Sequence, residues 1–304
     1  MNQKRGVLLV LATAVISGFS IFINKFSVSE IEPSVFTFLK NIAVAVFLFS
    51  VLLLAKEWPS LKNISGKQWA QLTAIGLVGG SVPFLLFFNG LALTSAAMGS
   101  FIHKTLFIYA SVFAFFLLKE KINWKISLAA GLLLAGNLFL LNLKAFTFGK
   151  GEALIFIAAL LWGFENVLSK HALKELSGNV VAFGRMFFGS LFILLYLAFT
   201  GKLGIISTLS SANILWVLLT SVLLLLFVTT YYNGLKWIKV STATSILLLG
   251  SPITALLSFA FGNTLITLNQ AMGIFLILAG VLSAIFLVEF SDKRNLPYYT
   301  FKPS

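Results

Sequence analysis

Apolar residues fill this chain in runs of about twenty, and short polar gaps separate the runs. A helix that crosses the hydrocarbon core of a bilayer needs about 20 mainly apolar residues. Backbone polar groups in lipid must be satisfied internally, which favours helices over open strands. The pattern therefore predicts an all-α membrane protein with ten transmembrane helices. The predicted spans are residues 6–26, 34–55, 69–93, 96–118, 125–143, 152–170, 180–200, 213–235, 240–261 and 269–290.

The two ends of the chain are polar. Residues 1–5 form a short basic flank ahead of the first apolar run. A cleaved signal peptide ends in small residues of the A-x-A type, and residues 17–20 match that type poorly. We therefore expect the first run to be a retained helix. Residues 291–304 are expected to form a polar cytoplasmic tail.

Composition excludes several classes of protein. The chain is 59% hydrophobic and 10% charged, whereas a soluble domain carries about 25% charged residues. A net charge of +13 would suggest nucleic acid for a soluble protein, but here the basic residues lie in the gaps between apolar runs. The lack of cysteine excludes disulfides and thiolate metal sites. We expect no cofactor, no bound metal and no nucleic-acid partner; the expected partners are the lipid bilayer and a small-molecule substrate.

The same basic residues orient the predicted helices, because cytoplasmic loops carry an excess of Lys and Arg. With the N-terminus inside, inner segments hold 15 Lys and Arg and outer segments hold 4. Lys40, Lys104 and Arg185 fall within spans. This split indicates an even number of crossings with both termini cytoplasmic. We expect a multi-pass protein of the inner (cytoplasmic) membrane, and the oligomeric state stays open.

The chain repeats itself weakly after 144 or 145 residues. The matches are Gly18-Phe19 and Lys25 with Gly163-Phe164 and Lys170, Lys40 with Arg185, Asn89-Gly90 with Asn233-Gly234, and Ala135-Gly136 with Ala279-Gly280. They predict two five-helix units, residues 1–145 and 146–290. Five is odd, so the second unit would enter the membrane from the opposite face. That gives two inverted repeats around a central cavity, as in many secondary transporters; a duplication that only builds a stable bundle is the alternative.

Further short motifs accompany the repeat. They are Glu120 at the end of the fourth predicted helix, Gly131 and Ala135-Gly136 after it, and, in the second unit, Ser251-Pro252, Gly262, Gln270, Gly273 and Ala279-Gly280. With these motifs the chain resembles the EamA family of the drug/metabolite transporter superfamily, in two copies over nearly its whole length. Asn263 stands where the family usually has Glu, while Lys40 and Arg185 match its basic position in the second helix. The resemblance implies a ten-helix, exporter-type fold with a central cavity, and no particular substrate.

Few ionisable residues lie within the predicted spans, where a central charge costs on the order of 2.5–3.5 kcal/mol on insertion scales. Glu165 and Arg185 should lie at similar depth on adjacent helices. They would form a structural ion pair, line the inner mouth of the cavity, where Glu165 could exchange a proton, or snorkel to the interface. Lys40 holds the mirrored place near the outer side. It either snorkels to the interface or faces the cavity, and its counterparts on the first helix are Ser17, Ser20 and Asn24.

His103 and Lys104 should lie about 12 Å into the bilayer, too deep to reach the interface readily. Ser100 precedes them by about one turn, and no acid is within reach along the sequence. We expect both to line the cavity, where either the lysine is neutral or an anionic or zwitterionic substrate supplies the countercharge. A buried hydrogen-bonded pair and a misplaced helix boundary are the alternatives. The predicted substrate-binding residues are His103, Lys104, Ser100, Lys40, Arg185, Glu165, Trp162, Asn166, Tyr109 and Tyr232.

Glycine and proline mark two predicted helices. Gly79, Gly80 and Pro83 would let the third helix bend or pack closely, and Pro252 would do the same in the ninth.

These features predict a secondary transporter of a small polar metabolite, such as an amino acid or related carboxylate, working by alternating access. Three basic groups against one acid within the spans also suit a carrier of nucleotide sugars or phosphate esters, and a lipid flippase or passive channel stays open. A membrane enzyme is the poorer interpretation, because one intramembrane acid and two histidines offer little for catalysis. The sequence contains no G-x-x-x-x-G-K-[ST] motif, which argues against an ATP-driven pump. Proton coupling through Glu165 and facilitated exchange are both open.

Overall fold

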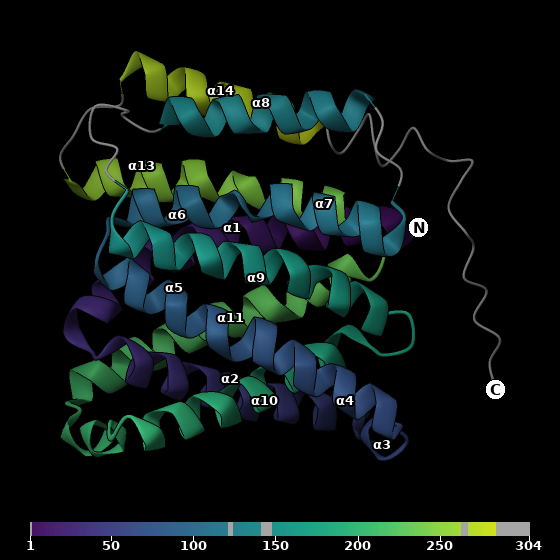
Figure 1. The fold of residues 1–304 in the computed structure, drawn as a ribbon, viewed down its shortest axis with the longest axis vertical. Coiled ribbons are helices and arrows are strands. Elements are labelled where there is room, and N and C mark those ends of the chain that lie inside the picture. The colour runs from purple at the N-terminus through teal and green to yellow at the C-terminus, as the bar shows by residue number, and fades with distance from the viewer. Residues whose placement is uncertain (1, 121–123, 141–147, 263–266, 284–304) are drawn as a thin grey trace.

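A computed structural model describes residues 2–120, 124–140, 148–262 and 267–283, and all regular structure within these ranges is helical. The helices lie side by side and stack along the longest axis of the molecule (Figure 1). In chain order the elements are α1 (Asn2–Glu30), α2 (Pro33–Leu54), α3 (Trp58–Lys62), α4 (Gly66–Ile75), the π-helical segment η1 (Gly76–Ser81), α5 (Val82–Ala92), α6 (Ala96–Lys104), α7 (Leu106–Leu118), α8 (Trp124–Leu140), α9 (Lys150–Ala172), α10 (Gly178–Phe199), the 3-10 segment η3 (Leu203–Thr208), α11 (Ser211–Leu235), α12 (Val240–Ile246), the 3-10 segment η4 (Leu247–Leu249), α13 (Gly250–Gly262) and α14 (Leu268–Ser283).

Eight helical stretches in the described part are long and apolar enough to cross a membrane, so the predicted class of all-α, multi-pass membrane protein holds. They are Gln3–Glu30, Pro33–Leu54, Gly66–Ala92, Ala96–Leu118, Lys150–Ala172, Gly178–Phe199, Ser211–Leu235 and Val240–Phe261. The corresponding predicted ends lie within four residues of these. With 17 and 16 residues, α8 and α14 are shorter than the usual span, so the count of ten stays a prediction. The predicted tail and Asn263 lie outside the described residues.

Several helices begin where a side chain accepts a backbone N–H of the first turn, the usual N-cap arrangement. Ser65 and Gln68 form a reciprocal capping box at the start of α4. Ser177 accepts from the Val180 N–H at the start of α10, and Ser95 accepts from the Met98 N–H at the start of α6. The polar gaps of the sequence therefore define the helix ends by hydrogen bonding as well as by polarity.

Helices α8 and α14 pack against each other at one end of the stack (Figure 1). A Cβ atom added to Gly136 would lie 2.8 Å from the Gly273 carbonyl oxygen, and one added to Gly280 would lie 2.8 Å from Leu133 Cγ. The two glycines that match in the repeated sequence thus each let the backbones of these two helices approach closely.

The third span is not a continuous α-helix. The segment η1 interrupts it between α4 and α5, and Pro83 follows in the first turn of α5. Here α10 comes into backbone contact: a Cβ on Gly80 would lie 2.1 Å from the Arg185 carbonyl oxygen. The close packing predicted at Gly79 and Gly80 is therefore present, and a π-helical segment precedes Pro83.

The fourth span of each predicted unit is also interrupted, at places about 144 residues apart. Thr105 separates α6 from α7, and η4 separates α12 from α13. At the end of α7, the Glu120 carboxylate accepts hydrogen bonds from the Val240 N–H (2.8 Å) and from the Ser241 N–H (3.3 Å). This acid, which stands at the end of the fourth predicted helix, therefore joins the end of α7 to the first turn of α12.

Contacts between helices recur at the same sequence offset. Lys25 Nζ donates to the Leu91 carbonyl oxygen (2.9 Å), and Lys170 Nζ donates to the Leu235 carbonyl oxygen (2.7 Å). The offsets are 145 residues for the lysines and 144 for the carbonyls. Each predicted unit therefore contains the same internal contact, between its first and third spans.

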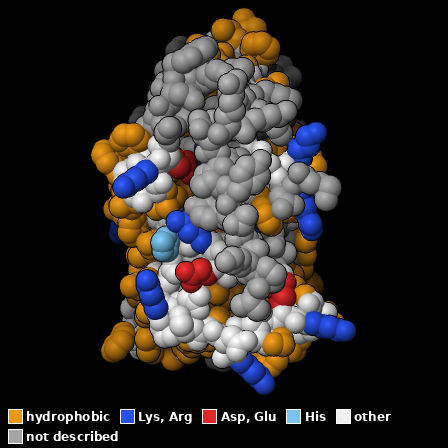
Figure 2. Space-filling view, turned by 90° about the vertical axis from the view of Figure 1, so that its right-hand side faces the viewer, with side chains coloured by type: hydrophobic (Ala, Val, Ile, Leu, Met, Phe, Trp, Pro, Cys, Tyr) orange, Lys and Arg blue, Asp and Glu red, His pale blue; other side chains and the backbone are white. Residues whose placement is uncertain are grey.

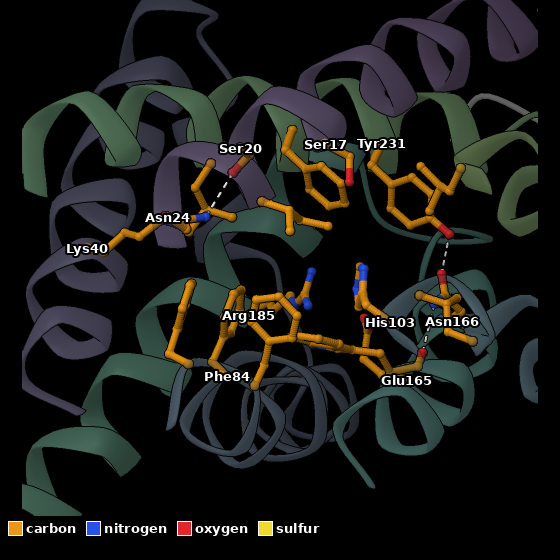
Figure 3. A pocket seen from close by; sticks show the side chains of 18 residues that line it. Ser17, Ser20, Asn24, Lys40, Phe84, His103, Glu165, Asn166, Arg185 and Tyr231 are labelled. Carbon is orange, nitrogen blue, oxygen red and sulfur yellow. Dashed lines mark hydrogen bonds between the residues drawn. The ribbon is translucent and has the colours of Figure 1, made fainter. Parts of the chain in front are cut away.

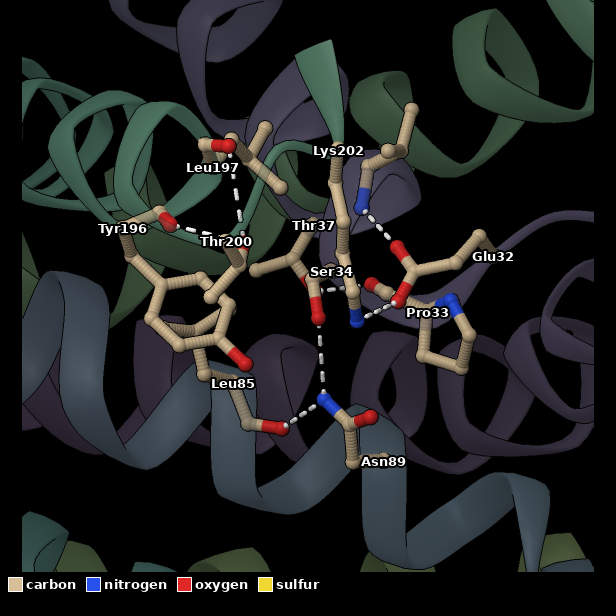
Figure 4. Close-up of polar contacts among 11 residues, drawn as sticks. Glu32, Pro33, Ser34, Thr37, Leu85, Asn89, Tyr196, Leu197, Thr200 and Lys202 are labelled. Atoms are coloured by element: carbon tan, nitrogen blue, oxygen red, sulfur yellow. Dashed lines mark hydrogen bonds and ion pairs between the residues drawn. The ribbon is translucent and has the colours of Figure 1, made fainter. Parts of the chain in front are cut away.

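Two polar links at the helix ends also join positions related by an offset of 145 residues, since Glu57 matches Lys202 and Glu32 matches Ser177. Lys202 pairs with Glu32 (2.6 Å), and Ser177 donates to Glu57 (2.5 Å). Close to the first link, Asn89 Nδ2 donates to Ser34 Oγ at 3.3 Å (Figure 4). The hydrogen bond to Glu32 raises the pKa of Lys202, which keeps that link ionic at neutral pH.

Charged side chains gather at one end of the helices. Figure 2 shows this face, which lies at the right of Figure 1, with lysines and acids among the polar connections and apolar side chains along the flanks. The connection that contains α3 lies on this side (Figure 1) and contributes the exposed lysines Lys56, Lys62 and Lys67.

The contact at Gly80 gives a test of the fold. We expect Gly80→Ala to lower the free energy of unfolding by about 1–3 kcal/mol, because the new methyl group must push η1 away from the α10 backbone. Thermal unfolding of the purified protein in detergent measures this change. Gly204→Ala is the matched control, since no atom lies within 4 Å of the added Cβ. Equal unfolding midpoints for the two variants would contradict the contact.

Candidate functional site

A cavity lies among the central helices, at about mid-length of several of them. Its volume is about 80 Å³, enough for on the order of five water molecules. Helices α1, α5, α9 and α11 contribute most of its walls, and α2, α6, α7, α10 and η4 add one residue each. The lining residues are Ser17, Ser20, Ile21, Asn24, Lys40, Phe84, Phe87, Phe88, His103, Leu106, Trp162, Glu165, Asn166, Arg185, Leu224, Phe227, Tyr231 and Leu247.

Lys40 lies at one end of the cavity, beside Asn24 of α1 (Figure 3). Its ammonium nitrogen donates to Asn24 Oδ1 at 2.8 Å, and the Asn24 amide donates to Ser20 Oγ at 3.1 Å. The same nitrogen lies 4.8 Å from the ring centroid of Phe88 and 5.5 Å from that of Phe36, within cation–π range. Lys40 therefore does not snorkel to the interface; its charge is held within the bundle by an amide and two aromatic faces.

Arg185 and Glu165 both line this cavity. They do not form a direct salt bridge, because Arg185 Nη2 donates instead to the Gly79 carbonyl oxygen (3.0 Å). Glu165 accepts from the Tyr232 hydroxyl (2.7 Å) and from the Ser169 hydroxyl. A Cβ on Gly79 would lie 2.4 Å from Glu165 Cγ and 3.1 Å from Arg185 Nε, so this glycine leaves the space that both side chains occupy.

Trp162 and His103 form a second wall. The Trp162 indole N–H donates to the same Gly79 carbonyl oxygen, at 2.9 Å. The His103 ring lies edge-on to the Trp162 ring, with centroids 4.9 Å apart, and lies 5.3 Å from the Phe87 ring. Figure 3 shows the His103 and Arg185 side chains pointing into the space between α1 and α9.

Tyr231 and Asn166 close the end of the cavity opposite Lys40 (Figure 3). The Tyr231 hydroxyl donates to Asn166 Oδ1, and Asn166 Nδ2 donates to the Trp162 carbonyl oxygen at 2.7 Å. The two side chains therefore satisfy each other and hold α9 against α11.

The structure brings six of the predicted residues to the cavity and places the other four behind its walls. The lining residues are Lys40, His103, Trp162, Glu165, Asn166 and Arg185; those behind the walls are Ser100, Lys104, Tyr109 and Tyr232. Lys104 Nζ donates to Ser17 Oγ at 2.5 Å, and Ser17 itself lines the cavity. Lys104 therefore does not line the cavity itself. It is buried and hydrogen-bonded to a residue that does, which is close to the alternative of a buried hydrogen-bonded pair.

The remaining three have structural contacts. Ser100 donates to Thr254 Oγ1 at 3.3 Å and links α6 to α13. Tyr109 packs over Gly163, where an added Cβ would lie 2.8 Å from Tyr109 Cβ. Tyr232 holds Glu165 through its hydroxyl, and its ring centroid lies 5.8 Å from Arg185 Cζ.

Aromatic side chains from α5 form one wall of the cavity, and the sequence analysis did not identify them. Phe84 lies 5.2 Å from Trp162, centroid to centroid, and 5.3 Å from Arg185 Cζ. Phe87 and Phe88 complete this surface. The repeat offered one indication: Phe88 lies 144 residues before Tyr232, and each ring lies next to the cation of its own unit, Lys40 or Arg185.

The cavity has more positive than negative groups. Lys40 and Arg185 are cations and Glu165 is the one carboxylate among its lining residues. Two buried nitrogens at the cavity, Arg185 Nε and His103 Nδ1, have no hydrogen-bond partner within the described residues. A buried polar group without a partner costs about 1–3 kcal/mol, so a polar solute that bonds to these nitrogens would be stabilised there.

Comparison with known proteins agrees with this architecture. The EamA-like transporter family matches the chain twice, over residues 4–142 and 149–286. An uncharacterized transporter of Clostridium kluyveri is 23% identical over 291 residues, which cover 91% of this chain and 92% of that protein. The uncharacterized inner membrane transporter YhbE of Escherichia coli is 26% identical over 198 residues, 60% of each chain. A solved crystal structure with 18% identity covers 94% of this chain and 98% of its own, with a TM-score of 0.74, and shares the fold.

The bond between Tyr232 and Glu165 can be measured by a double-mutant cycle. Tyr232→Phe should preserve packing, since the matching position of the first unit is Phe88. We expect a coupling free energy of about 1.5–3 kcal/mol between Tyr232→Phe and Glu165→Ala, the usual value of a hydrogen bond to a charged group. Thermal unfolding of the wild type, both single variants and the double variant gives this number. Strict additivity would mean that the hydroxyl does not hold the carboxylate.

Proposed function

This chain belongs to the EamA-like transporter family, and on that premise we propose that it is a secondary transporter of a small polar metabolite carrying a carboxylate, such as an amino acid. Its relatives in Clostridium kluyveri and Escherichia coli are named as transporters, which favours transport over catalysis. The proposed direction is export, which rests on the likeness of the chain to exporter-type EamA carriers.

The observation that carries the substrate proposal is the set of cavity groups. Lys40 and Arg185 provide positive charge at separate places, and Arg185 Nε and His103 Nδ1 have unused hydrogen-bonding capacity. A carboxylate placed between them would gain charge-assisted hydrogen bonds. Glu165 supplies a negative group for the ammonium of a zwitterion, and the aromatic wall suits an apolar side chain.

The proposed mechanism is alternating access by two inverted five-helix repeats, residues 1–145 and 146–290, with ten crossings in all. Three observations support it: the double family match, the lysine-to-carbonyl bonds that recur at an offset of 144–145 residues, and the interruptions of both fourth spans. Two repeats of opposite orientation can exchange conformations, which would open one cavity to each side in turn.

We further propose that the protein lies in the inner membrane with both termini cytoplasmic. The lysine-rich gaps favour this orientation, and the name of the Escherichia coli relative is consistent with it.

The second candidate function is a carrier of phosphate esters, favoured by the excess of cationic over acidic groups in the cavity. A phosphate ester carries more negative charge than a carboxylate, so Glu165 would be an unfavourable neighbour for it. We therefore rank the phosphate-ester carrier second.

The cationic groups give the first test of this function. A thermal-shift screen of the purified protein against a metabolite panel should yield a stabilising ligand. We expect Lys40→Met and Arg185→Met each to weaken its binding by about 10–100-fold, equivalent to about 1.5–3 kcal/mol for one charge-assisted hydrogen bond. Lys202→Met, which removes a cation outside the cavity, should bind as the wild type does. If both cavity variants bind normally, the carboxylate proposal fails.

The coupling is tested at Glu165. We expect Glu165→Gln to keep counterflow exchange in proteoliposomes and to lose acceleration by an imposed pH gradient, since the amide carries no titratable proton. Glu152→Gln is the control, because Glu152 is a buried acid that bonds Thr94 and the Gly149 N–H away from the cavity. An unchanged response of Glu165→Gln to the gradient would favour facilitated exchange.

A further inference from the structure

A second hollow lies away from the central cavity, between α2, α3, α4 and α10, with a volume of about 500 Å³. We refer to it as the α2–α10 groove. Its walls are apolar except for one lysine, and it opens at the surface, where Val46 is 57% exposed. The lining residues are Ile42, Ala45, Val46, Phe49, Trp58, Leu61, Lys62, Trp69, Phe183 and Phe187.

We propose that the α2–α10 groove binds one acyl chain of an anionic phospholipid, with the lipid phosphate held by Lys62. This site is separate from the transport cavity, and the proposal does not depend on which solute is carried.

The length of the groove fits one leaflet of a bilayer. Its lining on α2 runs from Ile42 to Phe49, and Ile42 lies twelve residues before the helix end at Leu54. Twelve residues at 1.5 Å per residue correspond to about 18 Å, and one leaflet contributes about half of a hydrocarbon core roughly 30 Å thick. An acyl chain that enters beside α3 would therefore end near Ile42, about at the bilayer midplane.

Tryptophan marks the headgroup end of the groove. Trp58, at the start of α3, packs edge-on against Phe49 with ring centroids 5.3 Å apart, and Trp69 of α4 lines the same end. Tryptophan is enriched at the membrane–water interface. Lys62 follows Trp58 by one helical turn, so its ammonium group lies at the level where a lipid phosphate would be.

The charge around this end favours an anionic headgroup. Lys56, Lys62 and Lys67 are exposed, and lysines close to a membrane surface attract anionic lipid by about 1 kcal/mol each. The acid in this connection, Glu57, already accepts from the Ser177 hydroxyl (2.5 Å) and from Asn179 Nδ2 (2.9 Å). Its carboxylate is therefore directed to the start of α10 and away from the lysines.

The matching place on the opposite side of the molecule is occupied by the chain itself. The segment η3 follows α3 at an offset of 145 residues. Its residues Ile205 and Ile206 pack against the apolar cluster of Val35, Ile193 and Leu197. At the same offset, Trp58 and Lys62 of α3 correspond to Leu203 and Ser207, so the tryptophan and the lysine of the groove have no counterpart in η3. The groove is therefore a specialisation of the lysine-rich side, where anionic lipid of a cytoplasmic leaflet would be met.

The test uses lipids whose acyl chains carry bromine, which quenches nearby tryptophan. Full-length protein is placed in phosphatidylcholine vesicles that contain either brominated phosphatidylglycerol or brominated phosphatidylcholine. The emission of Trp58 is obtained as the difference between wild type and Trp58→Phe. We expect half-maximal quenching of Trp58 at about fivefold lower mole fraction of the brominated phosphatidylglycerol, the ratio that 1 kcal/mol gives.

Two lysine variants separate a site from general surface attraction. Lys62→Gln should remove the preference for phosphatidylglycerol, whereas Lys67→Gln, in the same connection but outside the groove, should keep it. Both lysines are exposed, so neither change should disturb folding, and thermal unfolding checks this. Equal quenching by the two lipids in the wild type, or equal loss of preference in both variants, would overturn the proposal.

Discussion

The burial of Lys40 and Arg185 is the constraint on which the centre of this molecule depends. A charge deep in a bilayer is costly unless polar groups and aromatic faces meet it, and each cation here has both. For Arg185 this requires the Gly79 carbonyl oxygen to point at the guanidinium, at a residue with no side chain to block Glu165. The π-helical interruption of the third span and the backbone contact between Gly80 and α10 belong to that same arrangement.

The two halves of the chain solve this problem with the same positions and different chemistry. In the first half, Lys40 is supported by the Asn24–Ser20 pair one turn apart on α1. In the second, the corresponding pair on α9 is Ser169–Glu165, beside Arg185. The scaffold is therefore repeated while the polarity is not, and the cavity has one end with a neutral partner and another with a carboxylate. Such asymmetry suits a ligand whose own two ends differ in charge.

The sequence allowed the helices to be predicted well, because the cost of exposing polar groups to lipid fixes where apolar runs begin and end. It also identified the buried ionisable residues of the cavity, since they are rare against an apolar background. It could not decide between His103 and Lys104: successive residues of a helix point about 100° apart, so equal depth does not imply the same face. The phenylalanine wall was equally hidden, because the chain has 32 phenylalanines and most apolar runs contain several. The π-helical segment and the short helix α3 depend on packing that no local pattern reports.

The carboxylate of Glu120 has a consequence for motion. It fastens the end of α7 to the first turn of α12, and both of these belong to spans that are interrupted near their middle. In a carrier of the proposed kind, the half-helices beyond such interruptions are the parts that can tilt. A tilt of one would then pull directly on the other, so that the two halves of the protein could not move independently. A single acid would thus couple the two half-helices, one from each predicted unit, that end on the same side of the membrane.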